Sequence, residues 1–283
     1  MQKLKLIECP RDAMQGLHDF IPTEVKIDYI NGLLECGFDT IDFGSFVSPK
    51  AIPQMRDTAE VLEGLNSSDS KLLAIIANER GANDAASHER IQYLGYPFSV
   101  SEEFQKRNTN ATIDESFSRV EGIREIAMKS NKELVLYLSM GFGNPYGEEW
   151  HPDIVAKWSE KLYKELDVKI LALSDTIGVA NPEIVDSLFS TLIQELPEVE
   201  FGAHLHTTPE NAKNLVRAAY EAGCRRFDGA IKGFGGCPMA KDDLTGNMPT
   251  EAMIAWFDAN NIETGIQSNS FVNSMQKAVQ VFP

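Results

Sequence analysis

A regular alternation of strand-like and helical patterns along residues 4–248 is the feature that most constrains the fold. Eight apolar runs have the length and composition of buried strands, and amphipathic patterns lie between them. Strands are predicted at 4–9, 40–44, 71–77, 91–98, 134–140, 168–173, 199–206 and 226–230. Helices are predicted at 23–36, 54–65, 80–89, 112–130, 152–166, 181–196 and 208–223, with Thr23, Thr112, Asn181 and Thr208 as N-caps.

Strict alternation predicts a parallel sheet, because each helix carries the chain back to the edge where the next strand starts. Eight such units predict an α/β protein with a (β/α)8 TIM barrel, which commonly occupies about 250 residues as one domain. We therefore expect residues 1–283 to form a single catalytic domain, in which 249–283 supply the last helix and a short C-terminal helical extension. An open doubly wound sheet is the competing architecture, but no Gly-x-Gly-x-x-Gly motif follows the first predicted strand.

The charge of the chain excludes several classes of partner. The formal net charge of −16 repels nucleic acid and anionic membrane surfaces, so we expect neither as a partner. No apolar run approaches the ~20 residues that span a bilayer. The first eight residues carry charges and enter a strand pattern at once, so we expect no signal segment and a cytoplasmic location.

The four cysteines show no Cys-x-x-Cys spacing, which argues against a zinc ribbon and a thioredoxin-type redox pair. Cys36 and Cys224 each lie beside a glycine at a predicted helix end, and we interpret both as small buried hydrophobic residues.

Two histidines at the end of the seventh predicted strand indicate a metal site. His204 and His206 are two residues apart, and strand periodicity places both side chains on one face. Two imidazoles held on one face can supply two ligands to a single metal ion. The alternative is a pair of structural histidines that hydrogen bond at a strand end.

The carboxyl ends of barrel strands meet at one mouth, so polar residues there are expected to converge. Asp12 follows the first strand and Asn247 follows the eighth. Together with His204 and His206 they offer a carboxylate, two imidazoles and an amide oxygen, which fit Mg²⁺ or Mn²⁺ better than zinc. Read alone, Asn247 is also an ordinary turn residue in Thr-Gly-Asn.

Further polar groups fall at the same predicted mouth, each with an alternative interpretation. Arg11 is a candidate for charge stabilisation or a surface partner of Asp12. Asp175 ends the sixth strand and is either an active-site carboxylate or a helix cap. Cys237 follows three glycines in a loop that could carry a thiol over the mouth, although a buried structural thiol is the alternative. Asp42 lies in the second predicted strand, and Gln15 follows the first.

These segments together resemble the 3-hydroxy-3-methylglutaryl-CoA lyase family of the TIM-barrel metallolyase superfamily, and the resemblance spans nearly the whole chain. The superfamily-wide motifs are Arg-Asp, His-x-His and Gly-Asn, whereas two segments are specific to the lyase branch. The matching segments are Pro10-Arg11-Asp12-Ala13-Met14-Gln15, Ser45-Phe46-Val47-Ser48-Pro49-Lys50, Ser174-Asp175-Thr176, His204-Leu205-His206, Gly233-Phe234-Gly235-Gly236-Cys237-Pro238 and Gly246-Asn247.

The resemblance implies a lyase that cleaves 3-hydroxy-3-methylglutaryl-CoA to acetyl-CoA and acetoacetate by retro-Claisen chemistry, a reaction of leucine degradation and ketone-body formation. It implies that Asp12, His204, His206 and Asn247 hold the divalent cation. Arg11 would stabilise the enolate, and Cys237 would take part in proton transfer. Asp42 and Asp175 are further catalytic candidates at matching positions.

The resemblance also implies an acyl-CoA substrate and a homodimer. Lys50, Lys232 and Lys241 are the candidate cations for the anionic CoA tail, although a surface lysine is usually only solvated, and Gln15 is a further candidate for cofactor binding. Three departures leave other functions open: Asp42 replaces the usual glutamate, Ala13 a glycine, and Thr207 an aspartate. The alternatives are a lyase for a related 3-hydroxyacyl-CoA, a Claisen-condensing enzyme of the isopropylmalate or homocitrate synthase type, and a catalytically silent acyl-CoA-binding homologue.

Overall fold

Eight parallel strands close into a barrel in the computed structural model, which describes residues 3–236 and 245–282. The strands follow one another in chain order around the barrel, and β8 pairs with β1 to close it. This confirms the predicted (β/α)8 fold. The strands are β1 (Lys5–Glu8), β2 (Thr40–Ser45), β3 (Lys71–Ile75), β4 (Ile91–Ser99), β5 (Glu133–Ser139), β6 (Ile170–Asp175), β7 (Glu200–Leu205) and β8 (Arg226–Gly229).

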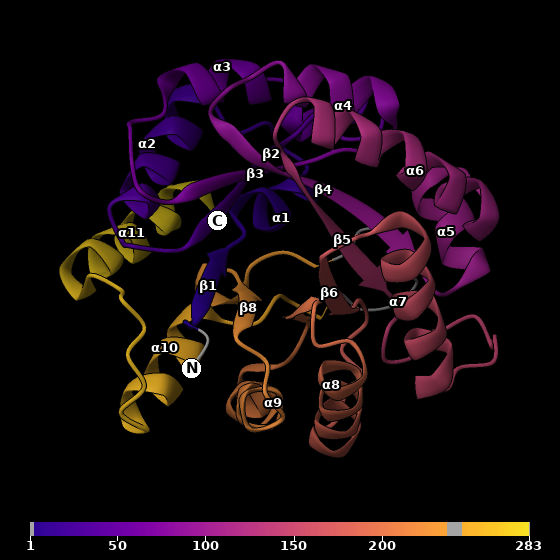
Figure 1. Cartoon of the computed structure of the whole chain (residues 1–283). Helices are drawn as coiled ribbons and strands as arrows, with labels where there is room; N and C mark the ends of the chain where they lie inside the picture. Colours follow the sequence, from indigo (N-terminus) through magenta and orange to yellow (C-terminus); the bar gives the residue numbers. More distant parts are fainter. Residues whose placement is uncertain (1–2, 237–244, 283) are drawn as a thin grey trace.

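Helices surround the strands in a ring (Figure 1). They are α1 (Pro10–Gln15), α2 (Thr23–Leu34), α3 (Thr58–Gly64), α4 (Glu79–Ala86), α5 (Glu102–Thr109), α6 (Ile113–Lys129), α7 (Pro152–Leu166), α8 (Pro182–Glu195), α9 (Pro209–Glu221), α10 (Thr250–Ala259) and α11 (Ser268–Val281), with short 3-10 turns at Pro53–Met55 and Ile231–Gly233. The sequence interpretation missed α1 and α5.

The helix starts follow local sequence rules. Thr112 forms a capping box with Glu115, and the Asn181 side chain accepts the amide of Ile184, as predicted for these two N-caps. Thr208 occupies the predicted position without a side-chain cap bond. The prediction for Thr23 was wrong, because Pro22 precedes the helix and the Thr23 hydroxyl instead donates to Asp57.

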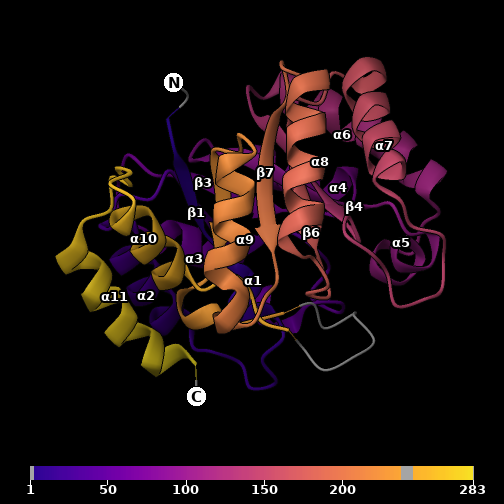
Figure 2. The same cartoon turned by 90° about the horizontal axis from the view of Figure 1, so that it is seen from below.

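Strand residues divide between two buried regions. Residues on the outer face of the strands pack against the helices, whereas the inner face forms a separate core within the barrel. At the end of the barrel where the chain leaves the strands, the inner layer becomes polar. Figure 2 shows that the β7 arrow points to this end, where α1 lies. The inner core consists of Leu73, Ile75, Tyr93, Val135, Tyr137, Ile170 and Ala172.

The C-terminal helix α11 packs beside α2 on the outside of the barrel (Figure 1). Edge-to-face ring pairs join Phe271 to Phe38 and Phe282 to Tyr29, at 6.2 and 5.9 Å between centroids. The predicted C-terminal helical extension is thus a packed layer of the fold. Within 3–236 and 245–282, no helix is long and apolar enough to cross a membrane. Cys36 and Cys224 are fully buried, as predicted.

Candidate active site

His204 near the end of β7 and His206 directly after it point together into the mouth of the barrel. Their rings lie 5.5 Å apart, and both residues are buried. His204 Nδ1 lies 3.2 Å from Asp228 on β8, which leaves Nε2 as its free ring nitrogen. His206 forms a β-bridge with Asn247. The strand periodicity therefore predicted the shared face correctly.

Asp12 reaches the same place from α1, the helix directly after β1. Its Oδ1 accepts hydrogen bonds from Arg11 Nη1 and Gln15 Nε2, both at 2.7 Å. Its Oδ2 accepts one from Asn247 Nδ2 at 2.8 Å. The second Nδ2 bond of Asn247 goes to the Phe234 carbonyl oxygen, so its amide oxygen is the atom with ligand character. The structure thus joins all four predicted metal-ligand residues.

The donor set fits a divalent cation. One ligand atom each from Asp12, His204 and His206 lies within 4.8 Å of the others, and His206 Nδ1 is buried with no hydrogen-bond partner among the described residues. Burial lowers the pKa of His206 to about 4, so the ring is neutral near pH 7, the state in which imidazole binds metal. Burial opposes ionisation of Asp12, but the positive charge of Arg11 and the hydrogen bond from Asn247 help to bring its pKa below its usual value.

Asp42 holds Arg11 in position beside this group. Its Oδ1 accepts Arg11 Nε at 3.2 Å and its Oδ2 accepts Nη2 at 2.5 Å, a bidentate contact between buried side chains. Burial raises the pKa of Asp42 to about 6 against the opposing charge of Arg11, so the carboxyl is ionised at pH 7. A shift in strand register between Asp42 and Gly44 marks a β-bulge here. Asp42 does not line the pocket itself, and its predicted catalytic role stays a prediction.

The glycine-rich segment after β8 lies against α1. Gly235 has φ +96°, and a Cβ at this position would lie 2.9 Å from the Asp12 carbonyl oxygen and 2.8 Å from Ala13 Cα. Only glycine allows the two backbones to approach this closely. Cys237 and Lys241 lie outside the described residues, so the predicted role of Cys237 stays a prediction.

Glu8 anchors both ends of this segment from the outer face of β1. Its carboxyl accepts the amide of Ile231 at 2.8 Å and the hydroxyl of Thr250 at 2.6 Å. Complete burial raises its pKa from 4.5 to about 8. Because Asn247 lies between these two anchor points, Glu8 helps to place a metal-ligand residue that it does not touch.

Two further predicted residues do not line the pocket beside the metal-ligand group. Both Asp175 oxygens accept backbone amides, from Val179 at 3.1 Å and Ala180 at 2.7 Å, so the carboxylate holds the loop before α8. Lys50 is exposed on the loop after β2. A catalytic role for Asp175 and a CoA contact for Lys50 stay predictions.

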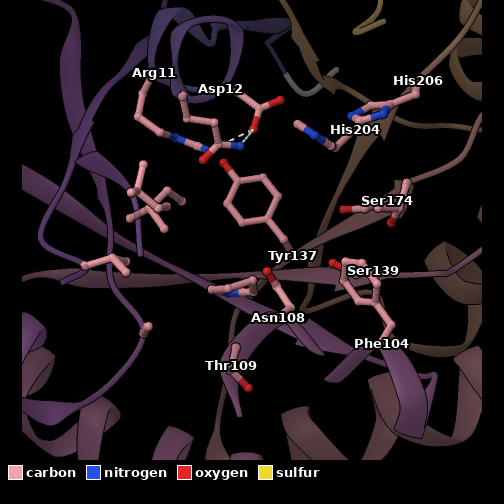
Figure 3. Close-up of a pocket in the computed structure, with 17 residues that line it drawn as sticks. Arg11, Asp12, Phe104, Asn108, Thr109, Tyr137, Ser139, Ser174, His204 and His206 are labelled. Carbon is pink, nitrogen blue, oxygen red and sulfur yellow. Dashed lines mark hydrogen bonds and ion pairs between the residues drawn. The ribbon is translucent and has the colours of Figure 1, made fainter. Parts of the chain in front are cut away.

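A pocket opens beside the metal-ligand group (Figure 3). Arg11, Asp12 and both histidines lie on one side, and residues of α5 line the other. The Tyr137 ring stands edge-on to His204 at 5.3 Å, and its buried hydroxyl has no hydrogen-bond partner. Sequence reasoning missed Tyr137 and Ser139, although alternation along β5 places both on the inner face. It missed the lining residues Phe104, Asn108 and Thr109 because it missed α5.

Comparison with known proteins agrees with this arrangement. A family model described as HMGL-like matches residues 4–277. The mitochondrial hydroxymethylglutaryl-CoA lyase of Macaca fascicularis is 35% identical over 269 residues, which cover 94% of this chain and 81% of the relative. The chain belongs to the HMG-CoA lyase family. Because the related proteins are named lyases, the chain is an enzyme of the carbon–carbon lyase class.

Solved structures of the family share the whole barrel. An HMG-CoA lyase from Acenitobacter baumannii, in complex with coenzyme A and 3-methylmalate, has a TM-score of 0.91 and 33% identity, covering 99% of this chain and 91% of that one. The HMG-CoA lyase from Brucella melitensis has a TM-score of 0.91 and 30% identity, covering 99% of both chains. The lyase family and the barrel, both expected from the sequence, are thereby confirmed.

Proposed function

We propose that the protein cleaves 3-hydroxy-3-methylglutaryl-CoA to acetyl-CoA and acetoacetate, using Mg²⁺ or Mn²⁺ held by Asp12, His204, His206 and Asn247. The observation that carries this proposal is the meeting of these four residues beside Arg11, in a pocket at the barrel mouth of a lyase-family chain. A related lyase has been crystallised with coenzyme A, which supports an acyl-CoA substrate here.

The reaction converts a tertiary alcohol into a ketone and an enolate. The 3-hydroxyl loses its proton, the bond between C2 and C3 breaks, and its electron pair passes to the thioester as an enolate. When bound, the cation supplies Lewis acidity that favours loss of the hydroxyl proton. Acetoacetate then carries the new carbonyl, and protonation of the enolate carbon gives acetyl-CoA. We assign a part in this proton transfer to Cys237.

Arg11 is placed to meet the charge that develops on the thioester oxygen. Its guanidinium lines the pocket, and its hydrogen bonds to Asp42 and Asp12 hold it in position. A donor that is already oriented requires no reorganisation as the bond breaks. Gln15 also lines the pocket and Lys50 lies on an exposed loop, and we propose that they contact the CoA thioester and its anionic tail.

Acetoacetate production tests the proposal. Purified full-length protein is mixed with the thioester and Mn²⁺ or Mg²⁺, and no turnover with either ion would refute it. His206→Ala should reduce kcat/KM by more than about 100-fold, because it removes a ligand of the cation. His18→Ala is the matched control, since the His18 side chain is fully exposed and forms no part of the pocket.

A panel of 3-hydroxyacyl-CoA thioesters distinguishes this substrate from related ones. Preference for another member of the panel would replace the substrate and keep the lyase chemistry. Condensation of acetyl-CoA with a 2-oxo acid would instead assign the protein to the synthases, and metal binding without any turnover would indicate a silent homologue. We also expect a homodimer, which light scattering of the purified protein measures.

A further inference from the structure

A second cluster of possible ligands shares His204 with the Asp12 group. It comprises Cys9 at the end of β1, His204 on β7 and Asp228 on β8, which come from adjacent strands of the closed barrel. One ligand atom from each residue lies within 4.8 Å of the others, and all three residues are buried. Neither Cys9 nor Asp228 lines the pocket, and the proposed reaction uses neither the Cys9 thiol nor the Asp228 carboxylate.

The cluster has unused bonding capacity. Within residues 3–236 and 245–282, Asp228 Oδ1 is buried without a hydrogen-bond partner and Cys9 is a free thiol. The distance of 3.2 Å between His204 Nδ1 and Asp228 Oδ2 is close to the edge of a zinc tetrahedron, about 3.3 Å for bonds of about 2.05 Å. Thiolate, imidazole and carboxylate are all zinc ligands, and the thiolate is the soft ligand that the Asp12 group lacks.

The surrounding charges also favour a cation at this place. The carboxylates of Asp12, Asp42 and Asp228 all interact with the Cys9 thiol, against the single guanidinium of Arg11 among its strongest charged neighbours. The buried guanidinium of Arg226 also interacts with Asp228, so three carboxylates face two guanidinium groups here. An ion bound between Cys9 and Asp228 would still gain net attraction inside the low-dielectric barrel.

We propose that Cys9, His204 and Asp228 form a second metal site, selective for thiophilic divalent ions such as Zn²⁺ and Cd²⁺. On binding, the S–H bond of Cys9 breaks, the proton passes to solvent, and sulfur, His204 Nδ1 and an Asp228 oxygen each donate a pair to the ion. A neutral imidazole has one free nitrogen lone pair, so ligation through Nδ1 leaves the proton on Nε2. This second ion and the cation of the Asp12 group therefore compete for His204, a consequence that rests on the proposed function.

Cadmium titration of the metal-free full chain tests the site directly. Cadmium bound to thiolate gives an ultraviolet charge-transfer band, and we expect it to saturate at one equivalent. Cys9→Ser should abolish the band, whereas the matched control Cys36→Ser should keep it, because the buried Cys36 thiol pairs with Ser274 far from this cluster. Asp228→Asn should weaken cadmium binding by at least about tenfold.

The same band in Cys9→Ser, or no saturable band in the wild type, would overturn the proposal. If thermal unfolding shows that Cys9→Ser fails to fold, Cys9→Ala gives the same comparison. An activity measurement then tests the competition: Zn²⁺ should inhibit the wild type, added Mn²⁺ should relieve the inhibition, and Cys9→Ser should resist it. Absence of lyase activity would refute the proposed function and leave the cadmium result to decide the site.

Discussion

Replacement of Glu8 by glutamine should remove a large pH dependence from the stability of this barrel. The folded-state pKa of Glu8 is raised from 4.5 to about 8, so folding favours the protonated carboxyl. The stability that this group contributes is complete below pH 4.5 and is lost as the pH rises to 8. Glu8→Gln mimics the protonated form: its amide oxygen can accept the Ile231 amide, and its NH₂ can donate to the Thr250 hydroxyl oxygen.

The size of the effect follows from linkage. One proton that the folded state holds and the unfolded state lacks changes the free energy of unfolding by about 1.4 kcal/mol per pH unit. Between pH 5.5 and 7.5, the wild type should therefore lose about 2.5 kcal/mol relative to Glu8→Gln, because the slope falls as the pH nears 8. With a urea slope of about 3 kcal/mol per molar, the midpoints should separate by about 0.8 M over this interval.

Urea unfolding of both proteins at half-unit pH steps measures the separation. Other groups that titrate in this range, such as Asp42, are common to both chains and cancel in the difference. The gap should widen steadily to pH 8 and then stay constant. Midpoints that run parallel across this range would refute the reasoning, because they would show that Glu8 ionises equally in both states.

Three further perturbations test the site. Asp42→Asn removes the charge opposite Arg11 and should destabilise the protein by about 3 kcal/mol in urea unfolding; an unchanged midpoint would contradict a buried ion pair. Gly235→Ala forces the Gly235 backbone away from the Asp12–Ala13 backbone and should lower kcat/KM about 100-fold. The control Gly147→Ala also changes a glycine at positive φ, but in open space, and should keep kcat/KM. Equal losses in the two variants would show that backbone strain alone is responsible. Mn²⁺ at 100 times its Kd should stabilise the wild type by about 2.7 kcal/mol, and it should stabilise His206→Ala much less. Calorimetry measures both values, and equal stabilisation of the two proteins would place the ion elsewhere.

Several parts of this protein follow from the sequence because they depend on neighbours along the chain. All eight strands were predicted within about two residues, since fully buried parallel strands appear as continuous apolar runs. His204 and His206 share a face because strand periodicity requires it. Motif spacing was enough to indicate the family, which the comparisons confirm. The short helices α1 and α5 escaped detection, because a helix of one or two turns has too little periodicity to recognise.

Only the tertiary structure decided what the polar side chains do. Asp42 and Asp12 both belong to the predicted mouth, yet Asp42 holds Arg11 in position, whereas Asp12 lies with His204 and His206. Glu8 and Cys9 look like ordinary strand residues until closure of the barrel brings β8 beside β1. A pKa, a ligand set or an ion pair depends on which groups from distant segments come into contact in the buried interior. Patterns of neighbouring residues do not predict these contacts.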